Sequence, residues 1–263
     1  MPAHGYHLNR DSEFFCLLNL GFGVNGSVVS VQEGQQQFLW TNLHLVQSFL
    51  SEWVKASGVR DAQLLKERIK EINIPLILKN HAGEIVFDSS LKTSSDRAYF
   101  ESVPSSLFLP DSKLSPLGVP DAVKIKLSKN LSHQLVMGQE ALPGTPVFLI
   151  GFPKPTDNRF TDFQAPDSNG IDQYLTFGEV LQAESLIEQF ELSPLTLKFA
   201  LEEDYKYTLN TDCEQGMSGG ALVNQAGEFI GLTQGIFSPS DHGPIACIAL
   251  KPRSLSFLEA ISE

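Results

Sequence analysis

Short apolar stretches, many of them alternating with polar residues, recur along most of the chain. A period of two residues and runs of β-branched residues are typical of strands, and Asn-Gly or Gly-containing pairs between them are typical of hairpin turns. Many short strands with few helices predict an all-β sandwich or barrel. The expected strands and hairpins cover residues 25–31, 35–43, 74–87, 121–127, 146–152, 221–232 and 245–250.

A helical period is found in two segments. Residues 61–72 repeat leucine and isoleucine along one face, and Asp61 stands before them as an N-cap. Residues 253–262 carry a second apolar stripe and predict a C-terminal helix. We expect loops over 88–120 and 153–170, which are rich in serine, proline or glycine, and no internal repeat.

Composition places the chain among globular proteins. It has 263 residues, of which 42% are hydrophobic and 19% are charged. A chain of this length forms one large domain or two small ones, and it can build a core without a metal or disulfides. The net charge of −12 disfavours partners that are themselves negative, so we expect neither nucleic-acid binding nor a polybasic membrane anchor.

The N-terminal region shows no targeting signal. Residues 1–13 are polar and do not form a secretory signal, and the apolar stretch 14–24 is too short for a membrane span. We therefore expect a soluble protein, either cytoplasmic or exported by a route that the chain does not show. The three cysteines, Cys16, Cys213 and Cys247, allow at most one bridge, and the scattered histidines form no metal-binding motif, so no metal is expected.

The clearest chemical motif is Gly216-Met-Ser-Gly-Gly220, which surrounds Ser218 with glycines. A nucleophilic serine needs backbone N–H groups directed at the oxyanion that develops during its attack, and glycines permit the backbone angles this requires. The alternative is a glycine-rich turn with no catalytic role. The nucleophile elbow of α/β-hydrolases is disfavoured, because an elbow is followed by a helix whereas residues 221–232 predict a hairpin.

Two further residues fit general acid–base chemistry. His44 follows a predicted strand directly, behind Thr41 and Asn42, and could act as a base at the strand end. Asp121 opens an alternating strand, where its carboxylate could hold the imidazole. Other aspartates between the histidine and the serine keep the choice of acid open: Asp88, Asp96 (the main competitor) and Asp111.

The order histidine, aspartate, serine with these flanks resembles the trypsin/chymotrypsin-like serine proteases, and among them the bacterial trypsin-like peptidases. Leu45 stands where the animal enzymes carry a cysteine. Met217 stands where they carry the aspartate that pairs with a cleaved N-terminus. The segments that carry the resemblance are 41–44, 121–127, 144–153, 177–180, 216–220 and 227–232.

The resemblance implies an all-β fold of two six-stranded antiparallel β-barrels, to which the sequence adds the C-terminal helix and the helical insertion near 61–72. Residues 14–132 would form the N-terminal barrel, which carries His44 and Asp121. Residues 133–263 would form the C-terminal barrel, which carries Ser218 and the terminal helix.

The implied activity is that of a serine endopeptidase that hydrolyses protein or peptide substrates through an acyl-enzyme. Ser218 would be the nucleophile, His44 the base and Asp121 the group that orients it, with the N–H groups of Gly216 and Ser218 as the oxyanion hole. No metal or organic cofactor is implied. The alternative is a catalytically latent protease-like module that binds a protein partner. The oligomeric state is not readable from the sequence.

The resemblance also implies a specificity pocket. Asp212 would form its floor and select basic side chains, unless it only caps a turn. A bridge between Cys213 and Cys247, at about the place of a family disulfide, stays open. The residues of the pocket wall would be Gln234, Gly235 and Ile236.

Overall fold

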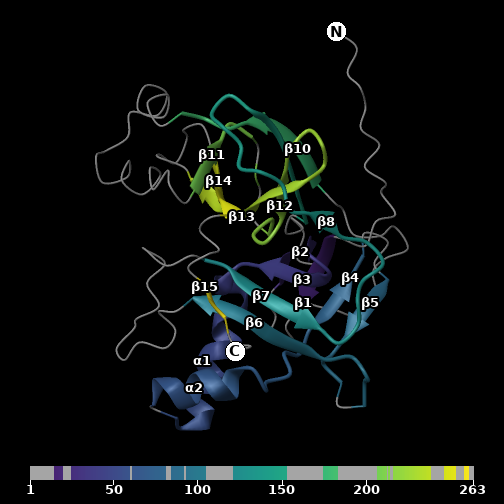
Figure 1. Ribbon diagram of the computed structural model, residues 1–263, viewed down its shortest axis with the longest axis vertical. Helices are drawn as coiled ribbons and strands as arrows, with labels where there is room; N and C mark the ends of the chain where they lie inside the picture. Colours follow the sequence, from purple (N-terminus) through teal and green to yellow (C-terminus); the bar gives the residue numbers. More distant parts are fainter. Residues whose placement is uncertain are drawn as a thin grey trace, which may run out of the picture.

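The computed structural model describes residues 15–19, 25–59, 61–80, 84–91, 93–104, 121–152, 174–182, 206–211, 213, 216–237, 246–252 and 258–260. These residues form two β-sheets stacked along the long axis of the molecule, with two helices at the far end of one of them (Figure 1). The arrangement confirms the all-β class that the sequence predicts.

The first sheet has nine strands in the order β15-β6-β7-β3-β2-β1-β4-β5, with the short β8 paired in parallel with β2. Its other pairings are antiparallel. The strands are β1 (Phe15–Asn19), β2 (Asn25–Glu33), β3 (Gln36–Thr41), β4 (Ile77–Lys79), β5 (Ile85–Asp88), β6 (Ala98–Pro104), β7 (Val123–Leu127), β8 (Leu135–Val136) and β15 (Leu258–Ala260).

The second sheet has six antiparallel strands in the order β10-β9-β12-β13-β14-β11. An antiparallel bridge between Val180 and Leu209 joins its two ends, which closes the sheet into a barrel. The strands are β9 (Pro146–Gly151), β10 (Tyr174–Glu179), β11 (Lys206–Leu209), β12 (Ala221–Val223), β13 (Phe229–Phe237) and β14 (Ala246–Leu250).

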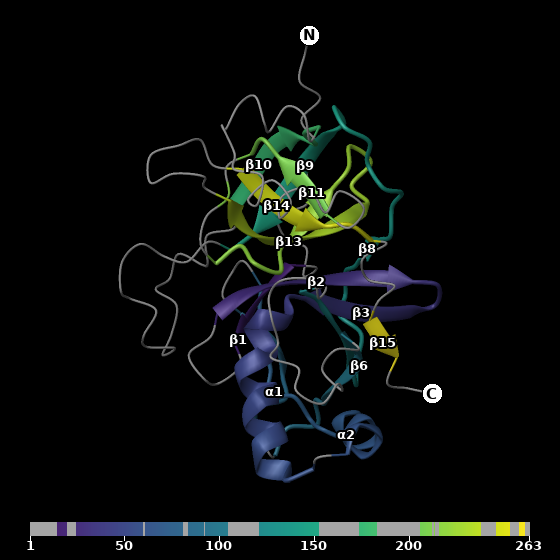
Figure 2. The same cartoon turned by 90° about the vertical axis from the view of Figure 1, so that its left-hand side faces the viewer.

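Two helices lie between β3 and β4 in the chain. Helix α1 (Leu43–Ser57) begins directly after β3, and helix α2 (Ala62–Ile69) follows it at the end of the first sheet away from the second (Figure 2). The Asp61 carboxylate accepts a hydrogen bond from the backbone N–H of Leu64 at 2.8 Å, which confirms the predicted N-cap. Helix α1 has 15 residues and was not predicted from the sequence.

The C-terminal end corrects a prediction. The helix expected over 253–262 is wrong at 258–260, because these residues form β15 and pair with β6; residues 253–257 and 261–262 lie outside the described part. Pairing satisfies the backbone N–H and C=O groups that the edge of β6 would otherwise leave open.

The predicted domain division, 14–132 and 133–263, stays a proposal. Strands β8 and β15 belong to the second of these segments in sequence, but both pair within the first sheet.

The predicted loop over 88–120 also needs correction, because β6 runs through it from Ala98 to Pro104. The predicted loop over 153–170 lies outside the described residues. The other predicted strands and both predicted hairpins agree with the structure, with ends that differ by a few residues.

The two hairpins share a local turn motif. Asn80 and Glu84 close the β4–β5 hairpin, and Asn224 and Glu228 close the β12–β13 hairpin, in the sequences Asn-His-Ala-Gly-Glu and Asn-Gln-Ala-Gly-Glu. In each, the asparagine Oδ1 accepts from the glutamate backbone N–H at 3.0 Å. The asparagine Nδ2 donates to the glutamate carboxylate, at 2.9 and 2.8 Å. The sheets therefore use the same turn chemistry.

Three apolar clusters form the core. One lies within the first sheet and includes α1 residues such as Val46 and Leu50, and another lies within the second barrel. The third contains side chains from both sheets, for example Val29 and Trp40 from the first and Ile150 and Phe229 from the second. It therefore packs the two sheets against each other, and the candidate site lies at this junction.

Candidate active site

His44 stands at the N-terminal end of α1, one residue inside the helix. Its backbone N–H donates to Asp121 Oδ1 at 2.9 Å, and its ring Nδ1 lies 2.7 Å from Asp121 Oδ2. The first N–H groups of a helix have no partner inside it, and the helix dipole favours a negative group there. The Asp121 carboxylate thus accepts from an N–H group at the start of the helix that has no partner within the helix, and its other oxygen orients the imidazole. The imidazole side chain is 43% exposed and the carboxylate 13%.

Asp121 lies just before β7, which pairs with β3 so that Val123 faces Thr41. The pairing brings the start of β7 beside the end of β3 and the start of α1. Asn42, which is fully buried, donates from its Nδ2 to the backbone carbonyl of Asp121 at 2.8 Å. Three hydrogen bonds from residues 42–44 therefore hold this aspartate.

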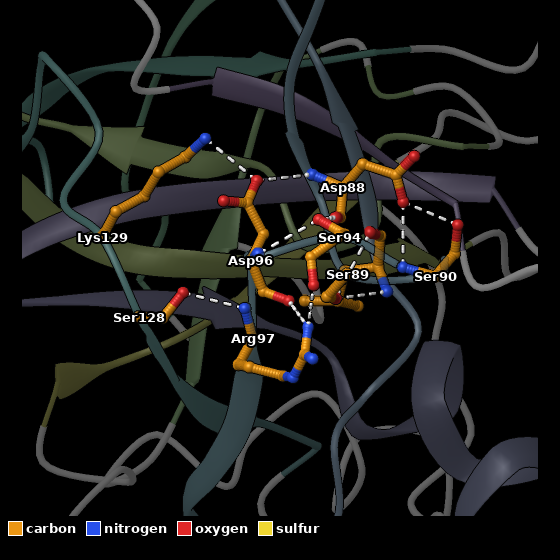
Figure 3. A network of polar contacts seen from close by, with 9 residues as sticks. Asp88, Ser89, Ser90, Ser94, Asp96, Arg97, Ser128 and Lys129 are labelled. Carbon is orange, nitrogen blue, oxygen red and sulfur yellow. Dashed lines mark hydrogen bonds and ion pairs between the residues drawn. The ribbon is translucent and has the colours of Figure 1, made fainter. Parts of the chain in front are cut away.

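The competing Asp96 is engaged elsewhere (Figure 3). Its carboxylate accepts from Lys129 Nζ at 2.9 Å and from the backbone N–H of Asp88 at 3.1 Å. Burial acts to raise the pKa of Asp96, but the hydrogen bonds from Lys129 and Asp88 and the nearby positive charges lower it overall. Lys129 follows β7 and Asp121 precedes it, so the two aspartates lie at opposite ends of that strand. Asp111 lies outside the described residues.

Ser218 lies in a tight loop between β11 and β12. Gly216 and Gly219 have φ values of 96° and 82°, which residues with a side chain rarely adopt. Met217 is fully buried in the second barrel, and the backbone N–H groups of Gly219 and Gly220 donate to Thr233 O and Met217 O, both at 2.9 Å. The glycine spacing seen in the sequence is therefore a requirement of this backbone path.

The serine loop contacts the first sheet close to the histidine. The Ser218 carbonyl accepts from the backbone N–H of Ser27 in β2 at 2.8 Å. A Cβ atom on Gly219 would lie only 2.0 Å from Ser27 O and 2.6 Å from Thr41 Oγ1. The loop that carries Ser218 therefore lies directly against the strands that lead to His44.

The hydroxyl of Ser218 donates to the backbone carbonyl of Gln234 at 3.2 Å. Among the described residues, no hydrogen bond joins this hydroxyl to the imidazole of His44. The histidine and the serine are thus placed on adjoining surfaces of the two sheets, with the serine hydroxyl turned toward β13.

The predicted pocket residues divide into two groups. Gln234, Gly235 and Ile236 lie on β13, where Gly235 pairs with Ile248 of β14. Of these, Gln234 is brought into contact with Ser218 through its carbonyl. Asp212 lies outside the described residues.

The thiols of Cys213 and Cys247 are free and buried, so no bridge joins them in this structure. The neighbouring Cys213 and burial together raise the pKa of the Cys247 thiol well above its usual range. The thiol is therefore protonated at neutral pH.

Sequence reasoning missed two residues of the site. Asn42 adjoins His44 in the sequence, so a polar residue next to a candidate base was an available signal for it. Ser27 had no such signal, because its partners in the serine loop follow it by about 190 positions.

No group of three or more His, Cys, Asp or Glu side chains in the described part of the chain could hold a metal ion. No described helix is long and apolar enough to cross a membrane.

Neither a protein-family model nor a curated protein sequence matches this chain. Three similar solved structures are proteases. The HtrA-type protease AlgW with a tripeptide is 16% identical with a TM-score of 0.55, and the match covers 96% of this chain and 60% of that one. The serine endoprotease from Yersinia pestis is 16% identical with a TM-score of 0.52, covering 94% and 61%. An inactive-form mutant of Rv3671c from M. tuberculosis H37Rv is 13% identical with a TM-score of 0.50, covering 93% and 83%.

These likenesses show the fold. The chain has the chymotrypsin-like architecture of trypsin-like and HtrA-type serine proteases, which confirms the fold that its sequence motifs implied. The strand number expected for the first barrel was wrong, because the described residues of the first sheet form nine strands and not six. It spans about 60% of the length of AlgW and of the Yersinia enzyme.

Proposed function

We propose that this protein is a serine endopeptidase. Ser218 attacks the scissile carbonyl, His44 accepts its proton and passes it to the leaving amine, and Asp121 orients the imidazole. The observation that carries the proposal is that both oxygens of the Asp121 carboxylate are bound by His44, one by its backbone N–H and the other by its ring Nδ1.

The chemistry of the imidazole follows from this contact. With Nδ1–H donating to the carboxylate, the tautomer leaves Nε2 with a free lone pair, which is the form needed to accept a proton. When the ring becomes positive, the carboxylate at 2.7 Å stabilises it. An exposed ring edge, held from behind by a mostly buried aspartate, suits a base that must reach a substrate.

The N–H groups of Gly216 and Ser218 would stabilise the oxyanion of the tetrahedral intermediate. A donor of this kind is worth about 3–4 kcal/mol in the transition state. The loop that carries them is supported by backbone bonds to Thr233 and by the buried side chain of Met217. Such preorganisation is what makes backbone N–H groups effective, because they need not reorganise during the reaction.

The substrates would be proteins or peptides. The carbonyl of Gln234 lies 3.2 Å from the nucleophile, close enough for β13 to form one wall of the substrate site together with Gly235 and Ile236. Asp212 is proposed as the residue at the floor of that pocket.

A latent protease-like module that binds a protein partner is the second candidate. One observation favours it: the Ser218 hydroxyl donates to Gln234 O and not to His44. Catalytic hydrogen bonds are often long or misaligned before substrate binds, however, so this rotamer is also compatible with an active enzyme. We therefore place the endopeptidase first.

Labelling with a fluorophosphonate probe tests the proposal. The wild-type protein should be labelled, and Ser218→Ala should not, while both unfold at similar temperatures. Ser90→Ala is the matched control, because Ser90 also loses a hydroxyl hydrogen bond, to Asp88, outside the site; it should be labelled like the wild type. Absence of labelling in a folded wild type would contradict the endopeptidase and favour the latent module.

A further inference from the structure

Ser27 is a fully buried residue of β2 whose polar atoms bond to segments far apart in the chain. Its hydroxyl lies 3.4 Å from Gly216 O and accepts from the backbone N–H of Phe152 at 2.8 Å. Its backbone N–H donates to Ser218 O at 2.8 Å, and its carbonyl accepts from Thr41 Oγ1 at 2.8 Å. The hydroxyl therefore acts both as a donor, toward Gly216 O, and as an acceptor, from the Phe152 N–H.

The two loop carbonyls that Ser27 holds are well placed to control the proposed oxyanion donors. The Gly216 carbonyl belongs to the peptide unit between the Gly216 and Ser218 amides, and the Ser218 carbonyl belongs to the unit that follows. Peptide units are planar, so holding these oxygens restricts the rotations that would turn the two N–H groups away.

Ser27 itself is held from two sides. Thr41 fixes its carbonyl from β3, and Phe152 fixes its hydroxyl from the end of β9, so the contact joins both sheets. Ser27 and Phe152 are both buried, so removal of the hydroxyl would take the hydrogen-bond partner of the Phe152 N–H away in a site shielded from bulk solvent. Gly219 packs so closely against Ser27 O that no side chain fits between them.

We propose that Ser27 is a positioning residue: it fixes the backbone of residues 216–220 and thereby the N–H groups of Gly216 and Ser218 that bind the oxyanion. This inference rests on the proposed function for its catalytic part. Its structural part, the immobilisation of the loop, stands apart from any activity.

The experiment compares Ser27→Ala with Ser30→Ala. Ser30 is the matched control, since it lies on the same strand, is equally buried and has a hydroxyl that forms no hydrogen bond with any described residue. Peptide hydrolysis, inhibition by a peptide boronate that forms a tetrahedral adduct, and deuterium uptake by the segment 216–223 are measured for both.

The expected result is specific to Ser27→Ala. Its kcat falls about 10- to 100-fold with KM nearly unchanged, because displacing a reacting group by about 1 Å has effects of this size. The boronate binds more weakly by a similar factor, and the 216–223 amides exchange faster. Ser30→Ala matches the wild type in all three. A role in folding alone would lower the folded fraction without this split between kcat and KM.

Several outcomes would overturn the inference. Equal deuterium uptake in Ser27→Ala and Ser30→Ala would do so even if the wild type proves inactive, which separates this failure from that of the proposed function. An unchanged kcat and an unchanged boronate affinity in Ser27→Ala would also overturn the inference. If Ser27→Ala does not fold, Ser27→Cys, whose thiol is a weaker hydrogen-bonding group, replaces it. Failure of both to fold while Ser30→Ala folds would assign Ser27 a purely structural role.

Discussion

Two buried amides at opposite ends of β3 offer a test that separates positioning from stability. Asn42, just after the strand, donates to the Asp121 carbonyl at 2.8 Å. The side-chain amide of Gln37, near its start, bonds to residues 131–134, away from the proposed chemistry. We expect Asn42→Ala to lower kcat strongly and the free energy of unfolding only slightly. We expect Gln37→Ala to lower the free energy of unfolding strongly and to leave kcat nearly unchanged.

The magnitudes follow from the bonds that each change removes. Truncating Asn42 leaves the Asp121 carbonyl without its partner, which costs about 1–3 kcal/mol of stability. It also removes a buried Oδ1 that has no hydrogen-bond partner among the described residues, so the net cost is about 0–2 kcal/mol. Gln37 accepts from Leu131 N at 2.6 Å and donates to Gln134 Oε1 at 2.8 Å and to Leu131 O at 3.1 Å, and its loss costs about 2–4 kcal/mol.

The expected loss of activity in Asn42→Ala has an upper bound. Replacing the aspartate of a serine-protease triad by asparagine lowers kcat by about 10⁴. Asn42 supplies one of the three bonds that hold Asp121, and the two from His44 remain. We therefore expect kcat to fall by about 10- to 100-fold, with KM unchanged.

Urea unfolding gives the free energy of unfolding, and peptide hydrolysis gives kcat and KM, for the wild type and both variants. The nuclear magnetic resonance signal of the His44 Nδ1 proton adds a readout that does not depend on turnover; it should weaken in Asn42→Ala only. An Asn42→Ala variant with wild-type kcat, or a Gln37→Ala variant with an equal loss of kcat, would refute the reasoning.

Two further predictions concern the serine loop and the aspartate at the far end of β7. Gly219→Ala should reduce fluorophosphonate labelling at least 100-fold, because its Cβ would lie 2.0 Å from Ser27 O. Gly34→Ala is the control: its Cβ would meet no described atom within 4 Å, so it should lower the free energy of unfolding only by the strain of a positive φ, about 1–2 kcal/mol, and leave labelling unchanged. Asp96→Asn should leave peptide turnover unchanged and lower stability at neutral pH. The folded protein lowers the pKa of Asp96 below its ordinary value of 3.8. The stabilisation by the ionised carboxylate is therefore fully present above pH 3.8 and is lost as the pH falls through the folded pKa. The free energies of unfolding of the variant and the wild type should converge in that acidic range.

The strands and hairpins that the sequence predicted have local signals, whereas β1, β6, β8 and β11 were not expected. Alternating residues specified β7, and the turn residues around Asn80 and Asn224 specified two hairpins. Helix α1 was missed because its first residues continue the apolar run of β3, and periodicity alone does not separate a strand from the helix that follows it. The terminal segment 258–260 was assigned to a helix because its short apolar pattern fits either structure, and only the free edge of β6 selects a strand.

The sequence by itself determined most of the strands, helix α2, the glycine-bounded Ser218, and the position of His44 close behind strand β3. Only the tertiary structure decided that Asp121 and not Asp96 contacts the imidazole, that Cys213 and Cys247 stay unbridged, and that Ser27 supports the serine loop. Turns, caps and alternation depend on residues a few positions apart, and the sequence displays these directly. The partners of Asp121 and Ser27 lie 77 and 189 positions away, and strand order and register alone bring them within hydrogen-bond distance.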